Sequence, residues 1–260
     1  MTVIVDTNSE QLAEHLRAKW GPPFVSSNVW GAVELGDPLH LPYVHRHHMQ
    51  QVVDDYEYFM FTEDDVMVPV ASFQFYASRQ QELWAKGWMF NWVRAELWGG
   101  DNVTAISIDN IEPVFNPRVY KGPSGQLYAE PWSPYCAFYV LDREQLRVMM
   151  DDPSDVWSNG FPPFLPREKM SVGYFYKYTG GSQQPYGAKG WRARALVPLD
   201  PMSGAVAAGA IAWHLPRKYA QSTQLWFHDL GSVPVHALFN WTDTGRPPPQ
   251  PLPLPELPPE

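Results

Sequence analysis

A cluster of histidines offers the clearest metal-binding chemistry in the sequence. It reads His40-Leu-Pro-Tyr-Val-His45-Arg-His47-His48. Neutral imidazole is the commonest metal ligand, and two histidines can share an ion at i, i+2 on a strand or at i, i+3 on a helix. His45 and His47 have the strand spacing, and His45 and His48 have the helix spacing. The cluster predicts a divalent metal such as zinc; the alternative is a solvated histidine-rich loop at the start of a helix.

A second set of histidines lies far apart in the sequence. His228 and His236 stand on the two strands of a hairpin expected over 223–241, and His214 lies on the preceding element. Three histidines from neighbouring strands can hold Zn²⁺ and leave one position open for water. The alternative is that His236 is a half-buried, hydrogen-bonded histidine of a strand.

Signatures of other catalytic classes are missing. The sequence contains no G-x-G-x-x-G, Walker A, H-E-x-x-H, G-x-S-x-G or C-x-x-C motif. Its adjacent aspartates fall in turn-like sequence, where Asp is expected for local reasons. Cys136, the single cysteine, lies in an apolar run that predicts a buried thiol without catalytic reactivity. The sequence therefore leans towards a protein that is not an enzyme and needs no cofactor.

Residues 246–260 (RPPPQPLPLPELPPE) contain eight prolines. This composition predicts an extended polyproline II arm that forms neither a helix nor a sheet ladder. It contains two P-x-x-P spacings, although Leu252 stands where an adaptor-domain ligand with Arg246 as its basic anchor would have proline. We expect the arm to bind a protein partner or to act as a spacer. The predicted partner-binding residues are Arg246, Pro248, Pro251, Pro255 and Pro258.

Composition excludes several classes of protein. The chain is 45% hydrophobic and 15% aromatic but only 18% charged, against about 25% charged in typical soluble domains. Intrinsic disorder over most of the chain is excluded, because it requires low hydrophobicity and high net charge. One cysteine and no short repeat exclude a disulfide-stapled miniprotein and a collagen.

The charge pattern indicates which partners to expect. The net charge is −9 and the basic residues form no run, which argues against direct contact with nucleic acid or an anionic membrane. The first residues do not resemble a signal peptide, and no apolar stretch is long enough to cross a bilayer. We expect synthesis inside the cell, and possible incorporation of the protein into a particle.

Apolar periodicity predicts the elements of the first 100 residues. Leu12, Leu16 and Trp20 recur at helical spacing after Ser9, which can cap the helix. Trp84, Trp88 and Trp92 are also spaced four apart, although Trp88 and Trp92 would equally alternate on a strand. We interpret these tryptophans as core rather than as a ligand platform. The expected elements are a strand at 3–5, a helix at 9–20, extended chain at 24–35, a short helix after residue 42, a hairpin of strands at 56–61 and 66–76, and a helix or strand within 80–98.

The rest of the chain reads as mainly strands. A short helix at 142–150 is predicted from Asp142 as its N-cap with Gln145 three residues later. The proline-rich stretch 151–166 is the best candidate for a hinge or surface excursion. The expected strands are 103–108, 112–120 (interrupted by proline), 127–129, 136–141, 170–179, 191–195, 223–229 and 233–241.

These elements predict an α+β fold: one β-rich body (1–245) of mostly antiparallel strands with three or four short helices, followed by the extended arm (246–260). Few charges and many aromatic residues and prolines are typical of interface cores. We therefore expect a structural subunit of a homo- or hetero-oligomeric assembly, for example an outer shell or decorating protein of a virus-like particle. The alternative is a small-molecule enzyme or binding protein with an aromatic pocket and a histidine-bound metal.

Overall fold

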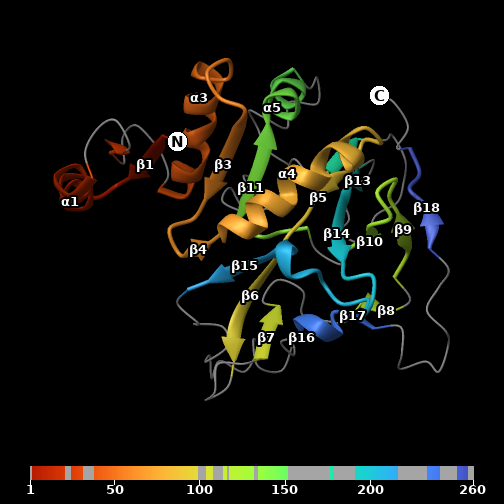
Figure 1. Ribbon diagram of the computed structural model, residues 1–260. Helices are drawn as coiled ribbons and strands as arrows, with labels where there is room; N and C mark the ends of the chain where they lie inside the picture. The colour runs from red at the N-terminus through yellow and green to blue at the C-terminus, as the bar shows by residue number, and fades with distance from the viewer. Residues whose placement is uncertain are drawn as a thin grey trace. The chain divides into compact units, whose positions relative to one another are not determined.

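The computed structural model describes an α+β protein with mostly antiparallel strand pairs (Figure 1). The described residues are 2–20, 25–31, 38–98, 104–107, 114–115, 117–131, 134–151, 176–178, 191–215, 233–240 and 251–256. Their contacts divide the chain into two compact units: unit 1 is Met1–Phe61 with Tyr139–Tyr174, and unit 2 is Thr62–Phe138 with Phe175–Glu260. The expectation of one body ending at residue 245 stays a prediction, because contact units do not show where a domain ends.

The described residues of unit 1 form two small sheets and three α-helices. The strands β1 and β2 pair in parallel, so that Asp6 lies opposite Asn28. The strand β3 pairs with β11, and one residue of each belongs to unit 2. The elements are β1 (Val3–Thr7), α1 (Glu10–Trp20), β2 (Val25–Val29), η1 (Pro38–Tyr43), α3 (Val44–Gln51), β3 (Tyr58–Thr62), β11 (Phe138–Asp142) and α5 (Arg143–Met150).

Two helices of unit 1 confirm the sequence prediction. At α5, the Asp142 side chain accepts from the Gln145 backbone N–H at 2.8 Å, and the Gln145 side chain accepts from the Asp142 N–H at 3.0 Å, which completes the capping box. At α1, the Leu12 N–H donates to the Ser9 hydroxyl. The apolar stripe of α1 is largely exposed, since Leu12 and Trp20 retain 40% and 54% of their surface.

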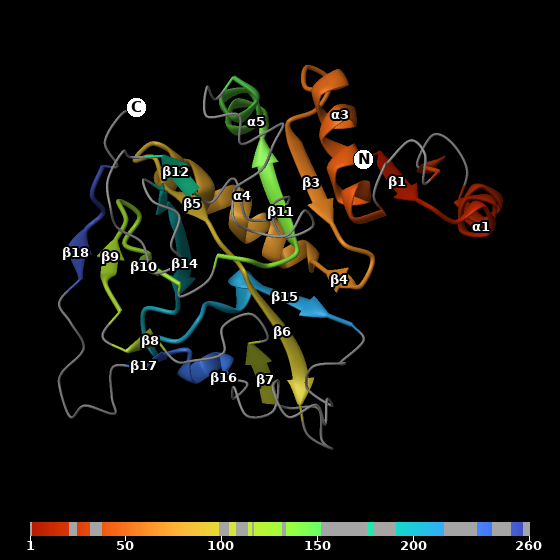
Figure 2. The same ribbon diagram turned by 180° about the vertical axis from the view of Figure 1, so that it is seen from behind.

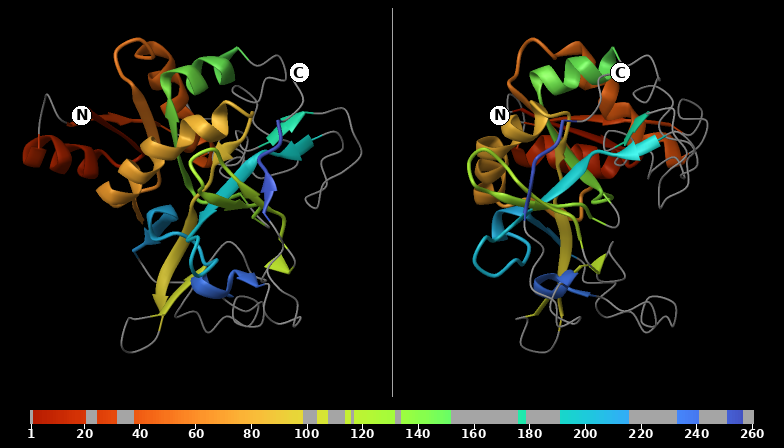
Figure 3. Two further views of the ribbon diagram at one scale, coloured as in Figure 1. Left: turned by 45° about the vertical axis from the view of Figure 1, so that its right-hand side comes forward. Right: turned by 90° about the vertical axis from the view of Figure 1, so that its right-hand side faces the viewer.

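Unit 2 is built around two five-stranded sheets, ordered β18-β9-β10-β14-β5 and β16-β7-β6-β15-β4. Figure 2 shows β10 between β9 and β14, and in Figure 3 the yellow β6–β7 hairpin has the blue β15 beside it. The elements are β4 (Val66–Met67), α4 (Val70–Trp84), β5 (Met89–Phe90), β6 (Val93–Trp98), β7 (Thr104–Ser107), β8 (Val114–Phe115), β9 (Val119–Lys121), β10 (Leu127–Ala129), β12 (Tyr176–Tyr178), β13 (Trp191–Ala193), β14 (Ala195–Leu199), η3 (Ala208–Ala210), β15 (Ile211–His214), β16 (Val233–Pro234), η4 (Val235–Ala237), β17 (Phe239–Asn240) and β18 (Leu252–Pro253).

The prediction of a strand over 66–76 was wrong. Only Val66 and Met67 form a strand, and α4 begins at Val70 after Pro69, whose extended conformation provides the N-cap. The buried face of α4 includes the polar side chains Ser72 and Gln80. Because these polar residues interrupt the apolar pattern, the helical periodicity of this segment is weak in the sequence.

The tryptophan-rich segment is core, as predicted, but it is not one helix. Gly87 adopts a left-handed φ of +80° just after α4, and the chain then continues as strands β5 and β6. Trp88 and Trp92 are almost completely buried. Trp92 stacks on Tyr76 with ring centroids 5.0 Å apart, and it also contacts Phe90 and Phe138.

The predicted strand over 233–241 is interrupted. Val235–Ala237 form a 3-10 turn between β16 and β17, which pair with different strands. The partner strand expected over 223–229 lies outside the described residues, as does all of the proposed hinge at 151–166 except Asp151. Within the part of the chain that the structure describes, every helix is too short or too polar to cross a membrane.

Candidate functional site

The histidines of α3 point to different partners, so the structure does not bring them together around one ion. His45 is half-buried in unit 1, where its Nδ1–H donates to the Pro42 carbonyl and its Nε2 accepts from the Tyr139 hydroxyl. Its ring stacks on Phe61 at 4.1 Å. Burial, followed by the charge of Arg46, holds the pKa of His45 well below its ordinary value, so the ring is neutral.

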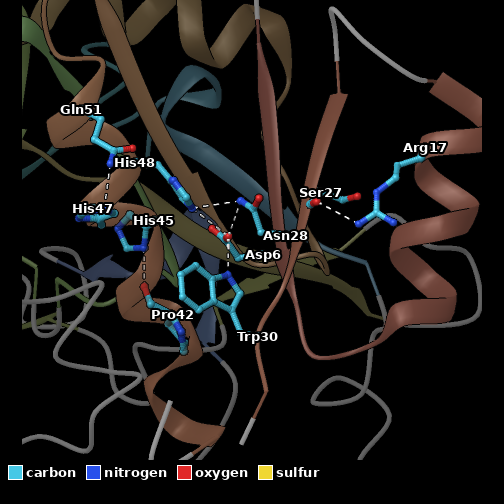
Figure 4. A network of polar contacts seen from close by, with 10 residues as sticks. All are labelled: Asp6, Arg17, Ser27, Asn28, Trp30, Pro42, His45, His47, His48 and Gln51. Carbon is cyan, nitrogen blue, oxygen red and sulfur yellow. Dashed lines mark hydrogen bonds and ion pairs between the residues drawn. The ribbon is translucent and has the colours of Figure 1, made fainter. Parts of the chain in front are cut away.

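His48 belongs to a polar cluster centred on Asp6 (Figure 4). One carboxylate oxygen of Asp6, Oδ1, accepts from Trp30 Nε1 at 2.9 Å and from Asn28 Nδ2 at 3.1 Å, and lies 3.1 Å from His48 Nε2. The side chains of Asp6 and His48 retain 11% and 18% of their surface. The parallel register of β1 and β2 places Asp6 opposite Asn28, Trp30 follows β2, and α3 supplies His48.

The third histidine of the helix is exposed. His47 Nε2 lies 2.9 Å from Gln51 Nε2, one helical turn later. His40 lies in η1, and its side chain is not described. Across the described ranges, no group of three His, Cys, Asp or Glu side chains could hold a metal ion.

His214 is the centre of a buried charge network in unit 2. Its Nδ1 lies 2.5 Å from Glu96 Oε1, and its Nε2 lies 3.0 Å from Asp65 Oδ2. The side chains of His214 and Glu96 are completely buried, and that of Asp65 retains 22% of its surface. The network connects β15 to β6 and to the residue before β4. Each ring nitrogen therefore has a carboxylate partner, and the two contacts hold three segments together.

The predicted grouping of His214 with His228 and His236 stays a prediction, because one of the three residues is not described. His236 is exposed on η4, and His228 lies outside the described residues. Glu96 and Asp65 were not identified from the sequence as partners of His214. Glu96 could have been noticed, because it is the single acid of β6 (VRAELW), a strand with four apolar residues in which a buried carboxyl group requires a partner.

A third site lies at the edge of a sheet in unit 2, where the tail segment (Pro251–Glu256) lies against the strand β9. Leu252 and Pro253 pair in parallel with Tyr120 and Lys121, and the Leu254 N–H donates to the Lys121 carbonyl at 3.3 Å. Both Figures 1 and 2 show β18 beside β9. The expectation that this sequence cannot join a sheet ladder was wrong here. Prolines alternate with leucines, so every second residue keeps the N–H that a ladder needs.

Side chains anchor the tail segment at three points. Leu254 is buried, with 8% of its surface exposed. Trp88 Nε1 donates to the Pro255 carbonyl at 2.8 Å, and Lys86 Nζ lies 2.6 Å from Glu256 Oε1. Beside the segment is a groove of about 400 Å³ whose lining includes Lys86, Lys121, Gly122, Pro123 and Pro251.

The floor of this tail site is aromatic. The rings of Trp88 and Tyr120 lie 5.8 Å apart, and the Tyr120 hydroxyl donates to Glu130 at 2.6 Å. Burial and this hydrogen bond raise the pKa of Tyr120 to about 12, so the phenol remains protonated. Of the predicted partner-binding residues, Pro251 and Pro255 lie in the tail segment, whereas Arg246, Pro248 and Pro258 lie outside the described residues. The tail's partners, Lys86 and Trp88, were not predicted.

No family model, curated protein or solved structure matches this chain.

Proposed function

We propose that the protein is a structural subunit of a larger assembly and that the tail segment connects one copy to the next. The observation that carries the proposal is the mode of docking on β9. The segment lies there as a bound peptide does: extended, paired through its backbone, with one buried leucine and two side-chain anchors. Adding a strand to an exposed sheet edge is a recurrent mode of peptide recognition.

Exchange of this segment between copies costs little contact energy. The backbone pairs, the Leu254 contact and the Trp88 hydrogen bond are the same whether the segment comes from its own chain or from a second copy. Swapping an identical element is for this reason a low-cost route to oligomers. The choice between the two states then depends on protein concentration and on the reach of the connection.

Composition supports the same proposal. A chain with only 18% charged residues and many aromatic residues and prolines has the composition of interface cores. The net charge of −9 favours a position away from nucleic acid, such as the outer layer of a particle. A shell or decorating protein of a virus-like particle is one assembly of this kind.

Two matched substitutions in the tail segment test the proposal. Leu254 is buried and Leu252 retains 53% of its surface, so Leu254→Asp and Leu252→Asp place the same charge two residues apart in different environments. Burial of a leucine contributes about 1.5–3 kcal/mol, and each 1.4 kcal/mol is about tenfold in affinity. We expect Leu254→Asp to weaken docking of the segment on β9 at least tenfold, both within one chain and between copies, so that the segment is released and the oligomers dissociate to monomers. Leu252→Asp should associate as the wild type does.

The measurement is the molar mass of the full chain by light scattering over a range of concentrations. Circular dichroism of each variant provides the control for folding. A wild-type chain that remains monomeric at every concentration would overturn the proposal, and so would equal association of the two variants.

A further inference from the structure

Three polar atoms in unit 1 form a nearly equilateral triangle. Asp6 Oδ1, the side-chain amide of Asn28 and His48 Nε2 are separated by 3.1, 3.1 and 3.2 Å. Figure 4 shows the three groups converging, with Trp30 donating to Asp6 from outside the triangle. The three atoms come from β1, β2 and α3, so their meeting depends on the fold of unit 1.

The three pairs of atoms in this triangle cannot all form hydrogen bonds while Asp6 is ionised. If His48 Nε2 carries a proton and donates to Asp6, the edge between His48 and the Asn28 nitrogen joins two donors. If Nε2 is unprotonated, it accepts from Asn28, but the edge to Asp6 then joins two acceptors. Turning the Asn28 amide by 180° places its oxygen against the Asp6 oxygen, which again joins two acceptors.

A cation at the centre of the triangle removes this conflict, because it can accept a lone pair from each of the three atoms. With the Asn28 oxygen turned inward, the carboxylate oxygen, the amide oxygen and the imidazole nitrogen all direct lone pairs to one point. Tetrahedral ligands at about 2.0 Å from a metal stand about 3.3 Å from one another. The edges of the triangle, at 3.1–3.2 Å, are close to this spacing.

We propose that Asp6, Asn28 and His48 bind one divalent transition-metal ion, with Zn²⁺ as the representative. A ligand set that combines an imidazole nitrogen with oxygen atoms suits zinc and other divalent first-row transition metals, whereas Mg²⁺ and Ca²⁺ prefer oxygen ligands alone. Three protein ligands leave a position open for water, and the partial exposure of Asp6 and His48 gives access to it. Trp30 Nε1 orients the Asp6 carboxylate as an outer-shell donor. This site is independent of the proposed role of the tail segment.

The neighbouring histidines are not ligands in this proposal. Both ring nitrogens of His45 are hydrogen-bonded to Pro42 and Tyr139, and His47 pairs with Gln51 on the exposed face of α3. His47 is therefore a matched control. It is the same residue type, adjacent in the sequence, and outside the triangle.

The first test is zinc titration of the chelator-treated full chain by calorimetry, followed by metal analysis after dialysis. We expect one ion per chain. Loss of an outer-shell partner alone costs about 10–100-fold in metal affinity, so we expect His48→Ala to exceed that range. His47→Ala should bind as the wild type does, and Mg²⁺ should not bind. Absence of stoichiometric zinc would overturn the proposal, as would equal losses in His48→Ala and His47→Ala.

The second test keeps the proposal falsifiable if His48→Ala fails to fold. Asn28→Asp places a second carboxylate at the triangle, so without metal the two acids repel and the melting temperature falls. With zinc, the added anionic ligand should strengthen binding, and zinc should raise the melting temperature more in this variant than in the wild type. A triangle held by hydrogen bonds alone predicts the same initial destabilisation with no rescue by zinc, which would overturn the site.

Discussion

His214 in unit 2 and His48 in unit 1 both contact carboxylates, yet their surroundings differ in one respect. His214 has one acid for each ring nitrogen, Glu96 and Asp65, so each nitrogen has a partner of its own. His48 directs a single nitrogen at two groups, Asp6 and Asn28, that cannot both be satisfied by protons. The comparison therefore distinguishes His214, whose ring nitrogens each have a carboxyl partner, from His48, whose Nε2 lies where we propose a metal ion.

The largest effect that sharpens this comparison is expected at His214. Replacing it with alanine removes the imidazole that contacts the fully buried Glu96 carboxyl group. Breaking a buried ion pair costs about 3–5 kcal/mol, so we expect a loss of that size in the free energy of unfolding, measured with urea. His236→Ala, at an exposed histidine of the same unit, is the control and should change it by less than about 0.5 kcal/mol. Equal effects of the two variants would show that the network does not stabilise unit 2.

A smaller effect is expected from the pH dependence of His45. Its pKa is depressed, mainly by burial and also by Arg46 and His48, so the unfolded chain takes up a proton at higher pH than the folded chain does. The contribution of His45 to the free energy of unfolding is therefore fully present above the ordinary pKa of 6.5. It is lost as the pH falls towards the depressed pKa. Unfolding measured at several pH values should show this decline in the wild type. His45→Gln, which cannot titrate, should show less of it; an identical profile would contradict the assignment.

The smallest effect is expected at the tail segment, where Lys86 and Glu256 form an ion pair that is exposed to solvent. The hydrogen bond and the charge of Lys86 hold the pKa of Glu256 below its ordinary 4.5. The pair therefore contributes fully above that pH and is lost as pH falls through the depressed value. Protection of the Leu254 amide, measured by NMR hydrogen exchange, should be slightly lower in Glu256→Gln than in the wild type. Changing the pH should restore little of the lost protection in this variant. A large effect would mean that this exposed pair carries the docking, contrary to the behaviour of surface ion pairs.

Local features were predictable because they depend on neighbours in the sequence. The capping box of α5 involves Asp142 and Gln145, three residues apart, and its reciprocal hydrogen bonds are recognisable from residue types alone. The burial of Cys136, Trp88 and Trp92 follows from the free energy of removing large apolar groups from water. The helix α4 was missed because its buried face contains polar residues.

The candidate sites were only partly predictable. His48 and the prolines of the tail segment were noticed from residue type and spacing, but their partners were not. Glu96 lies 118 residues from His214, and Trp88 lies 167 residues from Pro255. No periodicity relates residues at such distances, because the connection is made by strand pairing and not by the chain between them.

The sequence by itself determined which groups need a partner: an acid in the mainly apolar strand β6, histidines on a short helix, and leucines that keep their N–H between prolines. Only the tertiary structure decided which partner each obtained. Hydrogen bonds and metal coordination require atoms to be placed within a few tenths of an ångström, and that placement comes from strand register and helix packing. Asp6, Asn28 and His48 are three ordinary polar residues in the sequence, and the register of β1 and β2 beside α3 brings them to one point.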